Sequence, residues 1–72
     1  MNNMNWIPCK EELPQRSCQV LLTYKGFTGN QVAIAQFNPG IKSFEFENGK
    51  SAFVSGRPYN ALAWILIEPY EN

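Results

Sequence analysis

Short apolar runs alternate with polar turns along this chain of 72 residues. The runs are rich in branched and aromatic residues, which is the pattern of β-strands in a small domain. The predicted strands are 18–24, 31–37, 41–47, 51–55 and 61–67. The last run, Ala-Leu-Ala-Trp-Ile-Leu-Ile, is nearly continuous, and we expect it to form a central strand that is buried on both faces.

Turn-forming residues separate the predicted strands. The segment 26–30 is long enough for a loose hairpin connection and carries Phe27 as an exposed aromatic candidate. The Asn-Pro-Gly sequence at 38–40 predicts a tight turn, because proline presets one central angle and glycine accepts a left-handed one. The Asn-Gly dipeptide at 48–49 is typical of a type I′ hairpin turn. These connections favour antiparallel neighbours.

The elements predict a mostly β fold, or α+β at most, in a single small domain that covers residues 1–72. We expect about five strands in an antiparallel meander, curled into a twisted sheet or a small barrel. One short N-terminal helical turn is predicted at 10–13, where Pro14 would end it. Trp6 and Trp64 are the expected core anchors, because a buried tryptophan removes about 150–250 Å² from water.

Six basic and six acidic residues give a formal net charge of zero. Such a chain has no global field to hold a DNA duplex or an anionic membrane, and it lacks the basic stripe of a sequence-specific nucleic-acid binder. The distribution is uneven, since no acidic residue lies between Glu12 and Glu45, while Arg16, Lys25 and Lys42 do. This stretch is either a set of solvated strand edges and loop tips or a modest positive patch for a small anion.

The residues that usually carry catalysis are sparse. The chain has no histidine and no aspartate, so Cys9 and Cys18 lack the base that a nucleophilic cysteine needs. They also fall short of the four ligands of a structural zinc site. Glu45 and Glu47 lie two apart on one predicted strand face, which we interpret as a solvated face and not as a paired-carboxylate site. We therefore predict a protein that is not an enzyme and that uses no cofactor or metal.

The N-terminal sequence Met-Asn-Asn-Met-Asn lacks the basic region of a signal peptide, and no apolar run approaches the length of a membrane span. We therefore expect a cytoplasmic protein without a membrane partner, in which both cysteines stay reduced. Under oxidising conditions Cys9 and Cys18 could instead pair, if the first strand folds back on the N-terminal segment.

The chain resembles a small family of phage and prophage proteins that is catalogued as domain of unknown function 551. The resemblance is carried by Trp-Ile-Pro at 6–8, Glu-Leu-Pro at 12–14, Val-Leu-Leu at 20–22, a second strand centred on Ala35, and Trp64 shortly before Glu-Pro at 68–69. It covers almost the whole chain and implies a phage or prophage origin. Ala63 stands where the family pattern has a histidine, and the middle of the chain is longer than is usual in the family. The family supplies no known activity and no catalytic residue.

A binding role is the function that these residues favour. One version is counter-defence by sequestration of a small anionic ligand or nucleotide, in which cations hold phosphate groups and aromatic rings stack on bases. The candidate ligand-binding residues are Arg57, Tyr59, Lys25, Phe27, Tyr24 and Arg16. Arg57 and Tyr59 lie two apart in an irregular loop, a pattern that also suits a solvated cation and a ring packed on the rim. A homo-oligomer with the site between subunits would reconcile the small size with specific binding.

The alternative is a protein-interaction module that inhibits a host protein or serves in phage assembly. It would use an exposed aromatic residue such as Phe27 or Phe53, or an unpaired sheet edge that accepts another strand. Loss of Lys25 and Arg57 separates the two roles, because a phosphate binder needs these cations and a protein-binding module tolerates their loss.

Overall fold

The computed structural model describes residues 5–67. They form one six-stranded sheet in the order β1-β6-β2-β3-β4-β5, and every pair of neighbouring strands is antiparallel. The strands are β1 (Ile7–Pro8), β2 (Cys18–Gly26), β3 (Gly29–Asn38), β4 (Ser43–Phe46), β5 (Ser51–Ala52) and β6 (Asn60–Leu66). The described residues contain no helix, which confirms the mostly β prediction.

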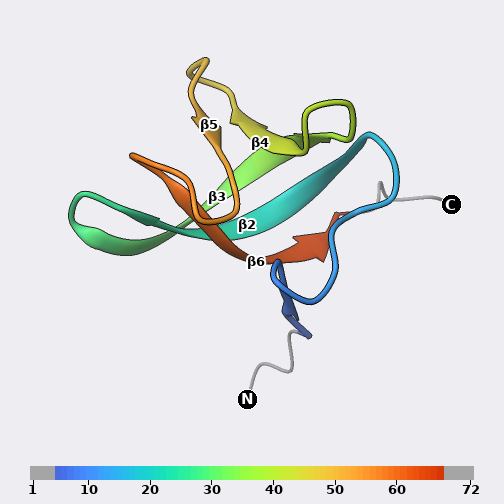
Figure 1. The fold of residues 1–72 in the computed structure, drawn as a ribbon, viewed down its shortest axis with the longest axis horizontal. Coiled ribbons are helices and arrows are strands. Elements are labelled where there is room, and N and C mark those ends of the chain that lie inside the picture. Colours follow the sequence, from blue (N-terminus) through green and yellow to red (C-terminus); the bar gives the residue numbers. More distant parts are fainter. Residues whose placement is uncertain (1–4, 68–72) are drawn as a thin grey trace, which may run out of the picture.

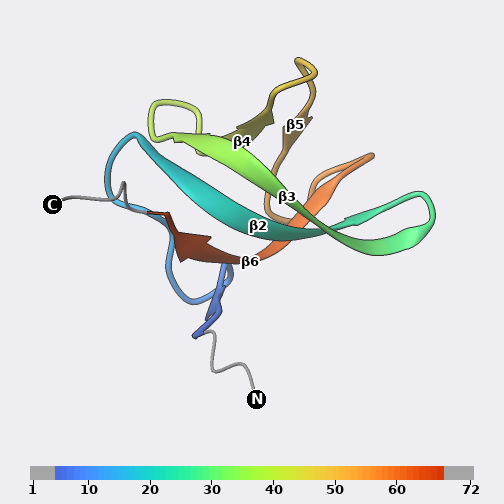
Figure 2. The ribbon, with the colours of Figure 1, turned by 180° about the vertical axis from the view of Figure 1, so that it is seen from behind.

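The strands β2 to β5 follow one another as a meander, but β6 does not continue it. β6 lies between β2 and the short β1, on the opposite side of β2 from β3 (Figures 1 and 2). The chain after β5 still touches the start of β6, because the Ala61 N–H donates to the Phe53 carbonyl at 2.9 Å and an isolated parallel bridge joins Phe53 to Asn60. The strand order is thus a meander whose last strand returns to β2.

Apolar residues of β2, β3, β4 and β6 build most of the core. Val20 and Leu22, two positions apart on β2, are fully buried, as the alternation of a strand requires on one face of a sheet. Phe37 and Phe44 pair across β3 and β4, and their ring centroids lie 4.9 Å apart. The core is therefore aromatic where β3 meets β4 and aliphatic along β2.

The two tryptophans differ in burial. Trp64 is 6% exposed, and its indole N–H donates to the Glu12 carbonyl at 2.9 Å, so its role as a core anchor is confirmed. Trp6 is only half-buried and lies outside the core cluster, so the prediction for this residue is wrong. The register explains the difference: Ile7 pairs with Trp64 and packs against the core, and the preceding residue of an extended chain points to the other face.

The connection between β2 and β3 is tighter than the sequence predicted. Gly26 pairs with Gly29, so Phe27 and Thr28 alone form the loop. Gly29, which follows the two loop residues, has a φ of 113°, a value that glycine adopts without steric cost. Phe27 lies in this turn and is 83% exposed, as expected.

The β4–β5 hairpin is not closed by a type I′ turn, so that prediction is wrong. A type I′ turn needs positive φ at both central residues, but Gly49 has a φ of 87° while the φ of Asn48 is not positive. The Phe46 N–H donates to the Lys50 carbonyl at 2.8 Å, which closes a three-residue loop with glycine in its last position. The predicted turn at 38–40 is confirmed. The Gly40 N–H donates to the Asn38 side-chain oxygen at 3.0 Å within this turn.

Two predicted strands are shorter than expected. The segment 41–47 becomes β4 only from Ser43, because Lys42 has a φ of 56° and belongs to the preceding turn. The segment 51–55 is reduced to β5, and Ser55 has a φ of 59°. Residues in this left-handed region do not continue a strand. β6 forms as predicted but is not buried on both faces, since Leu66 is 36% exposed.

The predicted helical turn at 10–13 is a single hydrogen-bonded turn at 9–11. The N–H groups of Glu11 and Glu12 both donate to the Pro8 carbonyl, at 3.0 and 3.1 Å. At the start of this turn the Cys9 N–H donates to the Leu62 carbonyl at 2.8 Å, which continues the pairing of β1 with β6 by one residue.

Candidate binding site

Two shallow hollows lie at the end of the sheet where β2 turns into β3. The first has a volume of about 610 Å³. Its described lining residues come from the β2–β3 hairpin and from the chain around the start of β6: Lys25, Gly26, Phe27, Gly56, Arg57, Pro58 and Asn60. This set holds two cations and no acidic residue. We call it the cationic hollow, and its charge suits a small anion.

Hydrogen bonds within the segment 53–60 shape the Arg57 side of the cationic hollow. The Gly56 N–H donates to the Phe53 carbonyl at 3.0 Å, and the Ser55 N–H donates to the Asn60 side-chain oxygen at 2.7 Å. A Cβ placed on Gly56 would lie 2.8 Å from the Cβ of Phe53, closer than real side chains approach. Glycine is therefore required here for the chain to approach Phe53 this closely.

The β2–β3 hairpin supplies the other side of the cationic hollow. Lys25 lies near the end of β2, where it pairs with Asn60 of β6. Phe27 follows in the turn, and its ring centroid is 6.1 Å from that of Tyr59 in an edge-to-face arrangement. Lys25 and Arg57 are both exposed, so each attracts an ion only weakly, and tight binding needs both cations together with an aromatic contact.

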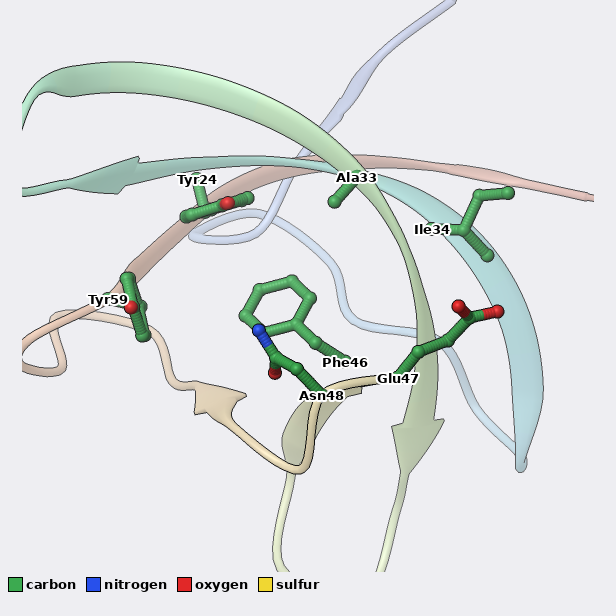
Figure 3. Close-up of a pocket in the computed structure, with 7 residues that line it drawn as sticks. All are labelled: Tyr24, Ala33, Ile34, Phe46, Glu47, Asn48 and Tyr59. Carbon is green, nitrogen blue, oxygen red and sulfur yellow. The ribbon is translucent and has the colours of Figure 1, made fainter.

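The second hollow, of about 420 Å³, is lined by aromatic rings and by one carboxylate (Figure 3). We call it the aromatic hollow, and its described lining residues are Tyr24, Ala33, Ile34, Phe46, Glu47, Asn48 and Tyr59. The Tyr24 and Tyr59 ring centroids are 5.6 Å apart at 89°. Phe46 lies 5.9 Å from Tyr59 at 86° and 4.8 Å from Tyr24. Tyr59 therefore stands nearly perpendicular to Tyr24 and Phe46, whose own rings are tilted by 46° to each other.

A short hydrogen-bond chain orients the Tyr24 ring in the aromatic hollow. The Tyr24 hydroxyl donates to the Gln31 side-chain oxygen at 2.8 Å, and the Gln31 amide donates to the Thr28 hydroxyl at 2.8 Å. The residues belong to the same hairpin, so the hairpin turn and the aromatic hollow are coupled through side chains as well as backbone.

Five of the six residues predicted to bind a ligand lie at this end of the sheet. Lys25, Phe27 and Arg57 share the cationic hollow. Tyr24 and Tyr59 line the aromatic hollow, and the contact between Phe27 and Tyr59 joins the two groups. The sequence could not show this division, because it depends on which face of each strand a side chain occupies.

Arg16 is not part of either hollow. It lies before the start of β2 and lines a separate hollow together with Ile7 and Trp64. Lys25 lies near the other end of β2, and nine residues of extended chain span roughly 25–30 Å. The structure therefore does not bring Arg16 together with the other candidate residues, and Arg16 provides a natural control for them.

The structure also assigns to the aromatic hollow residues that the sequence did not select. Glu47 is exposed, as expected for a solvated strand face, and it lines the hollow together with Phe46 and Asn48. Their position follows from the three-residue loop that ends β4, which the sequence signal at 48–49 did not predict. Glu45, in contrast, is half-buried and accepts from the Asn38 amide at 3.3 Å, so it is not simply solvated.

Both cysteines are free thiols. Burial raises the pKa of Cys9 to about 11, which keeps the thiol protonated at neutral pH. Burial also raises the pKa of Cys18, and the nearby Arg16 charge partly opposes this increase. Neither thiol has the character of an activated nucleophile. Among residues 5–67, no cluster of three or more metal-ligating side chains is present.

Comparisons with known proteins do not place the chain in a family: no family model, no curated protein and no solved structure matches it. The resemblance to domain of unknown function 551 stays a prediction. Within the described part of the chain, no helix is long and apolar enough to cross a membrane. The expectation that the N-terminal sequence is not a signal peptide concerns residues 1–5, of which 1–4 lie outside the described residues.

Proposed function

We propose that this protein acts by binding, without catalysis, and that its ligand is a small anionic molecule of the nucleotide type held at the cationic hollow. The observation that supports the proposal is the convergence of Lys25, Arg57 and the exposed ring of Phe27 on one hollow whose described lining has no acidic residue. Two cations provide charge-assisted hydrogen bonds to phosphate oxygens, and an exposed ring provides a face for a base.

The biological setting is part of the proposal. The sequence resemblance supports a phage or prophage accessory protein that works in the cytoplasm of the host cell and sequesters a signalling nucleotide as counter-defence. We also expect a homo-oligomer, because both cations are exposed on one protomer and a second subunit would enclose a ligand that one shallow hollow leaves open. No cofactor is required for this activity.

Native mass spectrometry of protein purified gently from cells tests the proposal. We expect an oligomer that carries an adduct of nucleotide mass. The Arg57→Ala variant should lose the adduct, whereas Arg16→Ala should keep it, although both variants remove one positive charge. A bare monomer that takes up no nucleotide from a cell lysate, or equal retention by the two variants, would overturn the assignment of this site.

A second candidate function is protein binding, and the exposure of Phe27 favours it. A phenylalanine that is 83% exposed at a hairpin tip is a common anchor for a protein partner. In this role the protein inhibits a host protein or joins a phage assembly. Binding of that partner should survive the loss of Lys25 and Arg57 and should fail in Phe27→Ser, which a pull-down with the three variants would distinguish.

A further inference from the structure

The outer edge of β3 is free along the hairpin. β4 pairs with β3 only from Ala35 to Asn38, so residues 29–34 have β2 on one side and no strand of the described residues on the other. The β2–β3 hairpin extends beyond β4 (Figures 1 and 2), and β6 flanks it only on the β2 side. A free edge of this kind presents backbone donors and acceptors that another extended chain can use.

The strand register shows which backbone groups face outward. In an antiparallel pair, the hydrogen-bonding groups of successive residues alternate between the two sides of a strand. The Ile67 N–H donates to the Gln19 carbonyl, so Gln19 and every second residue after it on β2 face β6. The backbone groups of the intervening residues of β2 face β3. The backbone groups of their partners on β3 face β2. Asn30 and Val32, the residues between those partners, therefore direct their N–H and C=O groups away from β2.

This edge lacks the features with which sheet proteins discourage pairing. β3 contains no charged residue and no proline along its ten positions. Val32 and Ile34 are 55% and 47% exposed, which is unusual for large apolar residues in the middle of a strand. Charges and prolines normally protect an edge, and β3 itself carries neither. The edge is thus suited to accept a strand.

The aromatic hollow lies along this edge. A hollow on one face of a sheet is lined by alternate residues of a strand, but this one is lined by the consecutive residues Ala33 and Ile34. It therefore opens beside the edge itself, where β4 would continue if it were longer. In Figure 3 the rings of Tyr24, Phe46 and Tyr59 stand on one side of this space and Glu47 extends toward Ile34.

We propose that the edge 29–34 binds an extended peptide from another protein, and that the aromatic hollow takes a lysine or arginine side chain of that peptide. Backbone hydrogen bonds to Asn30 and Val32 would hold the strand, and pockets beside the edge would select side chains. Aromatic rings attract a cation through their faces, and Glu47 is the charged residue in the described lining. Shape and charge thus point to the same ligand.

A second copy of this chain fits the same edge less well. Self-pairing would place residues 29–34 of the partner beside their own equivalents, and this segment contains no lysine or arginine. The paired segment of that copy would then bring no cation of its own to the rings or to the Glu47 carboxylate. The basic peptide is therefore the preferred occupant. This inference specifies the protein-binding role described above and does not depend on the cationic hollow.

Titration by ¹⁵N–¹H NMR with short end-capped peptides of alternating Thr and Val tests the inference. The peptide with a central Lys should shift the amides of residues 29–34 and slow hydrogen exchange at Asn30 and Val32. A peptide of the same length with a central Glu should bind at least about tenfold more weakly, because it meets a like charge. A Lys peptide with N-methylated backbone should fail to bind, because it cannot form the strand hydrogen bonds.

Two charge-matched variants locate the interaction. Glu47→Lys should abolish the preference for the Lys peptide over the Glu peptide, and Glu11→Lys, at an exposed turn far along the chain, should preserve it. Equal affinity of the wild-type protein for the two peptides, or shifts that avoid residues 29–34, would overturn the proposal. Exchange protection at Asn30 and Val32 in a self-associated protein without peptide would also overturn it in favour of a second copy. If Arg57→Ala loses a bound nucleotide, the preference for the Lys peptide should remain, because that peptide binds at a different place.

Discussion

The two ends of β2 differ in how their side chains are used. Near its start, Val20 and Leu22 are fully buried, and Trp64 on the neighbouring strand is fastened to Glu12 by its indole N–H. Near its end, Tyr24 is only half-buried among other rings, and the strand continues into an exposed turn. The same strand thus supports the core at one end and presents recognition groups at the other.

The difference shows how a short chain combines stability with binding. A domain of this size can bury only one core, so residues that remain exposed to meet a ligand contribute little to folding. The hollows lie where the aromatic rings contact one another and are not enclosed by a second layer. We call the region around Val20, Leu22 and Trp64 the closed end, and the region around Tyr24 and the two hollows the open end. We expect substitutions at the closed end to reduce stability and substitutions of exposed residues at the open end to reduce binding.

Phe44→Ala should have the largest effect on stability. Phe44 is fully buried and packs against Phe37, so its removal loses apolar burial and leaves a cavity. We expect the free energy of unfolding to fall by about 3–5 kcal/mol, measured by urea denaturation. A loss below about 1 kcal/mol would mean that this region is not the core.

Gly56→Ala should have the next largest effect on stability, and it is the exception at the open end because the glycine is sterically required there. The added Cβ would lie 2.8 Å from the Cβ of Phe53, so the segment must shift. We expect a loss of about 1–3 kcal/mol in the same denaturation experiment. Gly26→Ala is the control, because its Cβ would meet Tyr59 at an ordinary 3.4 Å and should be tolerated. Equal losses in the two variants would contradict the described fold of segment 53–60.

Cys9 should make stability depend on alkaline pH. Its pKa rises from 9.0 to about 11 on folding, so the folded state holds the thiol proton more tightly than the unfolded state. The resulting stabilisation is fully present below pH 9 and is lost as the pH rises from 9 through 11. We expect the wild-type protein to lose roughly 1–2 kcal/mol more than Cys9→Ala across this window. Parallel pH profiles for the two proteins would show that the thiol does not contribute.

Phe27→Ser should have the smallest effect on stability. The ring is 83% exposed and belongs to the turn, so its loss should change the free energy of unfolding by less than about 0.5 kcal/mol. The same change should weaken binding at the open end, which denaturation and ligand titration can measure on one sample. A large loss of stability would place Phe27 in the core and would remove the contrast between the two ends of β2.

The sequence predicted the strands well and their ends and packing less well. Periodicity located β2, β3 and β6, because apolar alternation directly reflects strand geometry. It overestimated the length of β4, because a residue with a left-handed backbone conformation, such as Lys42, has no clear signal in one sequence. The pairing of β6 with β2 joins residues far apart in the sequence, and local patterns do not encode such a pairing.

The candidate site could be predicted only in part. A cation and an aromatic residue two positions apart drew attention to Arg57 and Tyr59, which do lie at the open end. The separation into two hollows, and the participation of Glu47, follow from the hairpin register and were not visible in the sequence. Arg16 was included for its charge alone, and charge does not report distance along a strand.

An NMR titration of the ¹⁵N-labelled protein with ATP and GTP tests most directly whether binding resides at the open end. We expect the amides at 25–29 and 55–60 to shift together and those at 18–22 and 62–66 to stay unchanged. Arg57→Ala should suppress the shifts, while Arg16→Ala should leave them unchanged. Shifts that cluster around Arg16, or none at millimolar nucleotide, would contradict the assignment of anion binding to the cationic hollow.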